Sequence, residues 1–189
     1  MDQASEFQRL VLGHLDSLYS FGLLLTRDRA DAEDLLQDTL VRAFRSFSTF
    51  DRSYSCKVWL LQIMKHIQID RYRRRRSRPV EEEFEDDRTA GGESGREIDL
   101  FPAPLDPEQL LLRRLVIEEV RGAIRRLPPA WQEVIQLRDI EELTYAEIAR
   151  VLEKPIGTVM SRLYRARNQL RTLLLENTAE TTPKRRYGL

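Results

Sequence analysis

Residues 144–170 most constrain how this chain folds, because they contain two short amphipathic helices separated by a tight turn. Thr144 followed by Glu147 is a capping box, in which each side chain pairs with a backbone amide at the start of a helix. Pro155 suits the first turn of the second helix, because its missing N–H would have no helical partner there. Helical spacing predicts two buried stripes, formed by Ala146, Ile148, Ala149 and Leu152 and by Val159, Leu163, Ala166 and Leu170.

The outward face of the second expected helix is polar and basic. It carries Thr158, Ser161, Arg162 and Arg165, flanked by Met160, Tyr164 and Arg167. In a helix-turn-helix the second helix lies in the DNA major groove, where hydroxyls and guanidinium groups meet base edges and phosphates. The alternative is an amphipathic helix whose basic face is only solvated. We favour DNA binding.

Charge divides the chain into three parts, although the 189 residues have a formal net charge of zero. Residues 1–78 carry +4, residues 79–112 carry −9 and residues 113–189 carry +5. The stretch 79–107 is acidic and rich in glycine and proline, a composition that buries too little apolar surface to order itself. We therefore expect a flexible acidic linker there, between a domain at 1–78 and a domain at 108–176.

The periodicity predicts an all-α protein of two small helical domains. We expect three helices in the first domain, at about 5–26, 29–47 and 55–76, and helices at about 107–127 and 129–138 before the helix-turn-helix. Residues 177–189 are expected to form a disordered tail. The sequence contains no run of about 18 apolar residues, so we expect no membrane span. The start of the chain also lacks a signal-peptide layout, and the cytoplasm is the expected location.

A second basic feature ends the helix expected at 55–76. Six arginines fall within the eight residues 71–78, a density that would neutralise several phosphates. One stripe of the same helix interleaves polar, aromatic and basic groups, which suits unstacked bases beside a phosphate backbone; it comprises Trp59, Gln62, His66, Asp70 and Arg73, and Arg74 of the arginine run follows it. For Trp59 alone, core packing is the favoured interpretation.

The helix expected at 29–47 has an acidic face with Asp31, Asp34, Gln37 and Asp38. No histidine or glycine loop lies at a spacing that would make this face a metal or catalytic site. We therefore expect it to dock on a partner protein, and we expect neither enzyme activity nor a cofactor. Cys56 is the one cysteine, which suits a reducing compartment. At a helix N-terminus it could be redox-active, but an unreactive thiol is the favoured interpretation.

Four stretches resemble a bacterial sigma factor of the sigma-70 family, in its extracytoplasmic-function (ECF) group. The sequence D-A-E-D-L-L-Q-D-T-L-V-R-A-F-R-S-F at 31–47 is similar to the core-binding helix of region 2. The stretch 57–74 is similar to the family pattern W-L-x-x-I-A-x-N-x-x-x-D-x-x-R-R. Residues 127–152 and 155–167 are similar to region 4. The resemblance covers nearly the whole chain outside the linker.

This resemblance implies that the protein binds core RNA polymerase and directs it to promoters. Region 2 would melt the −10 element, with an unstacked base near the loop 48–55 and the stripe from Trp59 to Arg73, with Arg74 after it, facing that strand. Region 4 would recognise the −35 element, with Met160, Ser161, Tyr164 and Arg165 near bases and Thr158, Arg162 and Arg167 on phosphates. The implied core-polymerase contacts are Asp34, Leu35, Gln37, Asp38 and Phe44.

The resemblance also implies an anti-sigma factor as a partner, and neither membrane insertion nor a small-molecule substrate. Two positions depart from the family pattern: His66 stands in place of the usual asparagine, and Met160 in place of a basic residue. Loss of a bidentate donor at Met160 would remove about 1–3 kcal/mol of discrimination at one base. The alternative function is a helix-turn-helix transcriptional regulator that binds duplex DNA without polymerase.

Overall fold

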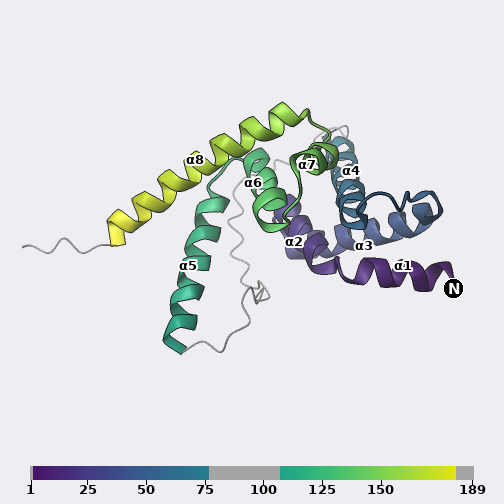
Figure 1. The fold of residues 1–189 in the computed structure, drawn as a ribbon, viewed down its shortest axis with the longest axis horizontal. Helices are drawn as coiled ribbons and strands as arrows, with labels where there is room; N and C mark the ends of the chain where they lie inside the picture. Colours follow the sequence, from purple (N-terminus) through teal and green to yellow (C-terminus); the bar gives the residue numbers. More distant parts are fainter. Residues whose placement is uncertain (1, 77–106, 182–189) are drawn as a thin grey trace, which may run out of the picture.

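The computed structural model describes residues 2–76 and 107–181, and within these two ranges every regular element is helical (Figure 1). The N-terminal domain contains α1 (Gln3–Leu12), α2 (Leu15–Thr26), α3 (Arg29–Ser46), the 3₁₀ turn η1 (Phe47–Thr49) and α4 (Cys56–Arg76). The C-terminal domain contains α5 (Pro107–Arg125), α6 (Pro129–Ile135), the π-helical turn η2 (Gln136–Ile140), α7 (Tyr145–Leu152) and α8 (Ile156–Thr181). The all-α class predicted from periodicity is confirmed.

The single helix predicted at 5–26 is wrong, because the chain breaks into α1 and α2 at Gly13 and His14. Glycine is a poor helix former, and here it ends α1 with the His14 amide donating to the Val11 carbonyl at 2.9 Å. The break turns α1 aside, so that Phe7 packs edge-on against Phe44 and Phe47 with ring centroids 5.2 Å apart. The N-terminal domain therefore has four helices.

Local sequence signals set the ends of the helices that follow. Arg27 ends α2 in the left-handed conformation, and the Asp28 carboxylate caps α3 by accepting from the Asp31 amide at 3.0 Å. Pro129 occupies the first turn of α6, as predicted. Each of these ends depends only on residues close in sequence, which is why the sequence predicts them.

The helix-turn-helix has the predicted capping box. The Glu147 amide donates to the Thr144 hydroxyl at 3.3 Å, and the Thr144 amide donates to the Glu147 carboxylate at 2.8 Å. Glu153 ends α7 in the left-handed conformation with φ at 51°. The Pro155 carbonyl then accepts from the Thr158 amide at 2.9 Å and so starts α8. The turn is therefore closed entirely by local hydrogen bonds.

Two details of the helix-turn-helix differ from prediction. Ala146 is exposed, whereas Val151 is fully buried and was not on the predicted stripe. The buried face of α7 is formed by Ile148, Val151 and Leu152, because the helix starts at Tyr145 and turns its first apolar position to solvent. On α8 the predicted stripe of Val159, Leu163 and Ala166 is buried, with Leu170 partly buried.

Helix α8 also continues to Thr181, past the predicted start of a disordered tail at residue 177. Before that point, Leu173 is buried and Leu174 is half-buried, so the packed side of α8 reaches beyond the predicted stripe that ends at Leu170. The remainder of the predicted tail, 182–189, and residues 79–106 of the predicted linker lie outside the described residues, whereas Pro107, the last residue of that linker, is the first residue of α5.

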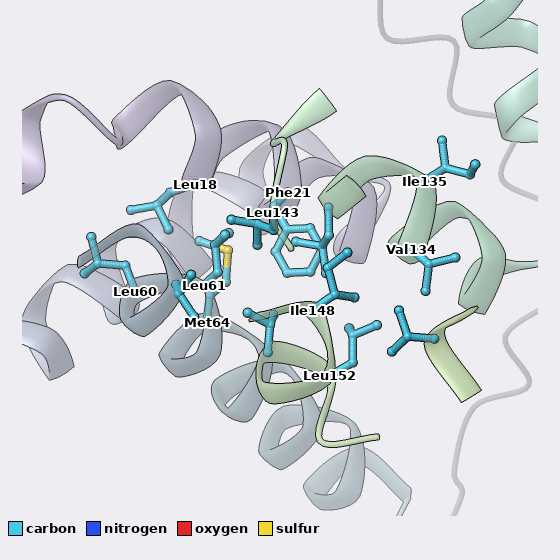
Figure 2. Packing of buried hydrophobic residues seen from close by; sticks show 14 of the residues in the cluster. Leu18, Phe21, Leu60, Leu61, Met64, Val134, Ile135, Leu143, Ile148 and Leu152 are labelled. Atoms are coloured by element: carbon cyan, nitrogen blue, oxygen red, sulfur yellow. The ribbon is translucent and has the colours of Figure 1, made fainter. Parts of the chain in front are cut away.

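One hydrophobic core serves both domains, although the sequence predicts two. Helix α7 packs against α4, and α6 packs against α2. Figure 2 shows Leu143, Ile148 and Leu152 of the C-terminal domain beside residues of the N-terminal domain, namely Leu18, Phe21, Leu60, Leu61 and Met64. Removing so much apolar surface from water is favourable at about 25 cal/mol per Å². The two domains consequently form one packed body.

Candidate nucleic-acid interface

The aromatic group predicted for the −10 strand lies at the N-terminal end of α4, beside the loop that follows η1. The Trp59 ring is half-buried and tilted against Phe50, with centroids 4.6 Å apart, and it lies 6.4 Å from Phe47. Trp59 therefore joins the packed aromatic cluster, as favoured from sequence, and remains partly exposed beside Phe50. An aromatic platform at a loop edge is a feature on which an unstacked base could stack.

Farther along α4, the polar members of the predicted stripe contact other parts of the chain. Gln62 is half-buried. His66 Nε2 lies 2.6 Å from Glu153 Oε1 at the end of α7. The Asp70 carboxylate lies 3.6 Å from the Arg42 guanidinium of α3. The stripe is thus one continuous face of α4, but two of its polar groups already have partners within the molecule.

The arginine-rich end of α4 is tied to the acidic face of α3. Arg71 donates to Asp38 at 2.5 Å, and the guanidinium of Arg75 lies 3.9 Å from the Asp31 carboxylate. Arg73 and Arg74 are exposed on the same turns. The run therefore serves two roles: part of it orients α3 against α4, and part of it presents positive charge to solvent.

The predicted core-polymerase residues divide into surface and interior positions. Asp34, Gln37 and Asp38 are exposed on α3, and Phe44 is 43% exposed while packing edge-on with Phe7. Leu35, in contrast, is 0% exposed and belongs to the core. Leu35 therefore supports α3 from the inside, which does not fit the contact with core polymerase that the family resemblance implies for it. The resemblance gives the position of Leu35 in the core-binding helix but not the direction in which its side chain points.

The outward face of α8 presents the residues predicted for DNA reading. Tyr164 is 70% exposed, Met160 is 51% exposed, and Ser161 and Arg165 are also exposed. Thr158 and Arg162 lie half-buried at the edges of this face. In Figure 1 α8 runs along the outer rim of the molecule. A helix in that position can enter a major groove with few changes in the rest of the fold.

Arg167 differs from its neighbours because it is held by Asp139 of η2. Its Nε atom donates to Asp139 Oδ2 at 3.3 Å, and its Nη2 atom pairs with Oδ1. This pairing raises the pKa of Arg167 above its ordinary value and keeps it charged. The pair links α8 to η2, and Arg167 borders the face of α8 that was predicted to read DNA.

Several charged residues that sequence reasoning missed meet between the two domains. The Lys57 ammonium lies 2.5 Å from Glu141 Oε2 and also donates to the Glu141 carbonyl at 3.0 Å. Lys65 donates to Glu133 at 2.7 Å. The partners are 84 and 68 residues apart in sequence. No local sequence pattern marks such pairs. Their only signal is the low exposure of the lysine and glutamate side chains, which is a property of the tertiary structure.

Within residues 2–76 and 107–181, no group of three or more histidine, cysteine, aspartate and glutamate side chains is placed to hold a metal ion. The same ranges contain no helix that is both long and apolar enough to cross a membrane. Cys56 is half-buried, and burial raises the pKa of its thiol. Because the thiolate is the reactive form, this environment favours the unreactive interpretation of Cys56.

Comparison with known proteins identifies the family. Residues 10–78 match the family model "Sigma-70 region 2", and residues 117–170 match "Sigma-70, region 4". The chain is 34% identical to the ECF RNA polymerase sigma factor SigE of Mycolicibacterium smegmatis over 95% of its own length and 66% of that protein. It is 32% identical to the RNA polymerase sigma factor YlaC of Bacillus subtilis, covering 79% of this chain and 80% of YlaC.

Among solved structures, the fold is similar to that of the sigma factor RpoE of Bartonella quintana in complex with the anti-sigma factor NepR. The TM-score is 0.64 at 27% identity, over 89% of this chain and 96% of RpoE. Two small helical domains ending in a helix-turn-helix define the class as a transcription factor of the sigma type. The chain belongs to the sigma-70 family, and specifically to its ECF group of RNA polymerase sigma factors.

Proposed function

We propose that this ECF sigma factor divides promoter recognition between its two exposed nucleic-acid faces. Helix α8 reads the −35 element, with Met160, Ser161, Tyr164 and Arg165 at the bases and with Thr158, Arg162 and Arg167 on phosphates. The observation that carries this assignment is the outward, exposed position of these side chains on the second helix of a capped helix-turn-helix.

Region 2 engages the −10 strand through α4 and the loop before it. The half-buried Trp59 offers an aromatic edge, Gln62, His66 and Asp70 offer hydrogen-bonding groups, and Arg73 and Arg74 supply charge. Bases held by stacking and phosphates held by arginine are the usual means of gripping a single strand. The imidazole of His66, in place of asparagine, shifts the base preference at its position.

The acidic side of α3 docks on core RNA polymerase through Asp34, Gln37, Asp38 and Phe44. An exposed phenylalanine on the same helix as exposed polar groups provides an apolar anchor and hydrogen-bonding groups, a combination that is typical of protein interfaces. The protein acts in the cytoplasm as an initiation factor and has no catalytic role of its own. An anti-sigma factor is a further expected partner, because RpoE, its structural relative, was solved with one.

Run-off transcription from a random promoter library, with bacterial core RNA polymerase, tests this proposal. Specific starts that require the protein and share −10 and −35 sequences are expected. Arg165→Ala should weaken starts that depend on the −35 element, whereas Arg171→Ala, an exposed arginine two turns farther along α8, serves as the matched control. Tight duplex binding by the protein alone, without starts, would instead identify a stand-alone regulator.

A further inference from the structure

The loop 48–55, beside which we expect an unstacked base, is held in shape by short-range hydrogen bonds. The Tyr54 amide donates to the Asp51 carbonyl at 3.1 Å, which closes a four-residue turn. Inside this turn the Ser53 amide donates to Asp51 Oδ1 at 2.9 Å. Donors and acceptors of both bonds lie within the loop. These bonds therefore fix the shape of the turn but not its position relative to the proposed strand contacts on α4.

An ion pair with α1 holds the tip of this turn. Arg52 occupies the second position of the turn, and its Nη2 atom lies 2.6 Å from Glu6 Oε1. The Glu6 side chain is only 25% exposed, whereas that of Arg52 is 69% exposed. Figure 1 shows α1 below the connection between α3 and α4, so the pair joins the loop to a separate helix. The position of the turn therefore depends on α1.

A row of aromatic rings joins the next residue of α1 to the base of the same loop. Phe7 packs edge-on against Phe47, with ring centroids 5.2 Å apart. Phe47 in turn stacks with Phe50 at 6.2 Å, and Phe50 lies 4.6 Å from Trp59. The row runs from α1, through the start of the loop, to the aromatic edge that we propose for the −10 strand. Two adjacent residues of α1 thus hold the tip of the loop and its base.

The pair between Glu6 and Arg52 is expected to matter more for binding than for stability. Val11, farther along α1, is buried in the core and holds the helix in place without this pair. An ion pair with a well-exposed member adds little free energy of unfolding, because solvent screens it. Ordering a loop before its ligand arrives has a separate benefit, since the loop then loses less conformational entropy on binding.

We propose that Glu6 and Phe7 are positioning residues for capture of the −10 strand. They hold the loop 48–55 where an unstacked base enters at the N-terminal end of α4. Neither residue contacts the DNA: Glu6 acts through Arg52, and Phe7 acts through the row of aromatic rings. This inference rests on the proposed function of α4 and the loop. It makes base preference at the −10 element depend on α1, while preference at the −35 element does not.

A charge exchange in the full chain tests the ion pair. Glu6→Arg alone and Arg52→Glu alone each place like charges together and should release the turn. The double variant should re-form the pair with its charges reversed. The matched control makes the same exchange, Glu118→Arg with Arg121→Glu, in a pair of α5 whose side chains are 60% and 40% exposed.

Loop mobility is measured first, by EPR of a nitroxide label at Ser53→Cys in a Cys56→Ser background. Position 53 is exposed, and its part in the turn uses only the backbone amide, which cysteine keeps. The label should gain mobility in both single reversals and regain the parental spectrum in the double variant, while the α5 control leaves it unchanged. Rescue by the double variant separates loss of the pair from loss of folding. The same spectrum in every variant would overturn the inference.

Transcription from the random promoter library, with bacterial core RNA polymerase, then measures the effect on recognition. Each single reversal should lower the yield of specific starts by about tenfold, which is the effect of having to order one further loop residue on binding. Base preference should flatten at the −10 element and stay unchanged at the −35 element, and the double variant should restore both yield and preference. A mobile loop with an unchanged −10 preference, or an equal loss of preference at both elements, would contradict a positioning role.

Phe7 is tested by a pair of variants of its own. Phe7→Ala removes the ring that meets Phe47 and should flatten the −10 preference, whereas Phe7→Leu keeps an apolar contact and should retain most of it. An unchanged −10 preference in Phe7→Ala would overturn the role of Phe7. Failure of the proposed function is seen separately, as Trp59→Ala and Arg165→Ala leaving the promoter-library starts unaltered.

Discussion

The proposed nucleic-acid faces of the two domains contrast in what surrounds them. On α4, Trp59 packs into an aromatic cluster, His66 meets Glu153 and Asp70 meets Arg42. On α8, Met160 and Tyr164 project into solvent from a helix at the rim of the molecule. The two faces have similar chemistry, since both combine aromatic or apolar groups with basic ones, yet the first is embedded in the fold and the second is displayed by it.

This difference shows that residue type does not by itself decide whether a surface is available. The α8 face is set by the short turn at Pro155 and by the helical period, both local, and tertiary packing leaves it exposed. The α4 face is set by the same period, but Glu153, which is 87 residues from His66 in sequence, and Arg42 of α3 lie against it. Variants that change one face and leave the other unchanged can therefore test this difference.

The largest effect is expected from the shared core beneath the α4 face. Leu61→Ala removes a side chain that is 0% exposed, so the free energy of unfolding should fall by about 2–5 kcal/mol. Because both domains share this core, one cooperative transition should shift in urea denaturation followed by circular dichroism. Leu175→Ala, at a 61% exposed position on α8, is the control. Two separate transitions would show that the domains do not share a core.

A smaller loss of unfolding free energy should follow from breaking the ion pair between Lys57 and Glu141, which joins the two domains. Lys57→Met leaves the nearly inaccessible Glu141 carboxylate without its cation, which costs about 1–3 kcal/mol in unfolding free energy. The comparison variant is Arg29→Met, which breaks the exposed pair with Glu33 on α3; exposed pairs contribute little to stability, because solvent screens them. Equal effects of the two variants in chemical denaturation would show that the Lys57–Glu141 pair contributes no more than an exposed pair.

The capping box offers a purely local comparison. Thr144→Ala removes the hydroxyl that accepts from the Glu147 amide, and loss of such a cap costs about 1 kcal/mol. Thr172→Ala, which removes a hydroxyl bonded within an exposed turn of α8, should change stability very little. Amide hydrogen exchange at the start of α7 should rise in the first variant alone. Unaltered exchange there would mean that tertiary packing, not the cap, holds the helix start.

The smallest expected effect is a pH dependence centred on His14, at the break between α1 and α2. Burial lowers the pKa of His14, the nearby Lys57 charge lowers it further, and Glu141 partly opposes them. Because the pKa of His14 is lower in the folded than in the unfolded state, protonation of its imidazole opposes folding. With respect to this group, the protein has its full stability above about pH 6.5 and loses stability as the pH falls through the folded-state pKa. His14→Gln should reduce the fall in Tm between pH 7.5 and 5.5. An identical fall in both proteins would assign the pH dependence to other groups.

Much of the fold could be predicted because its signals are local. The capping box at Thr144, the N-terminal proline of α6 and the buried stripe of α8 each depend on residues within one or two turns. The errors occurred where a local signal was too weak to decide. From the sequence alone, Gly13 could have stayed inside one long helix and Leu35 could have faced a partner. In the folded chain α1 ends at Gly13, and Leu35 is buried in the core.

The sequence by itself determined an all-α protein of the sigma-70 family and the chemistry of its two nucleic-acid faces, because helical periodicity and motif spacing are written in neighbouring residues. Only the tertiary structure decided that the two domains share a core and that glutamates of one cover basic groups of the other. The physical reason is sequence distance: Lys57 and Glu141 are 84 positions apart, and nothing near either residue specifies the other. Burial of the surrounding apolar surface brings them together and makes their pairing obligatory.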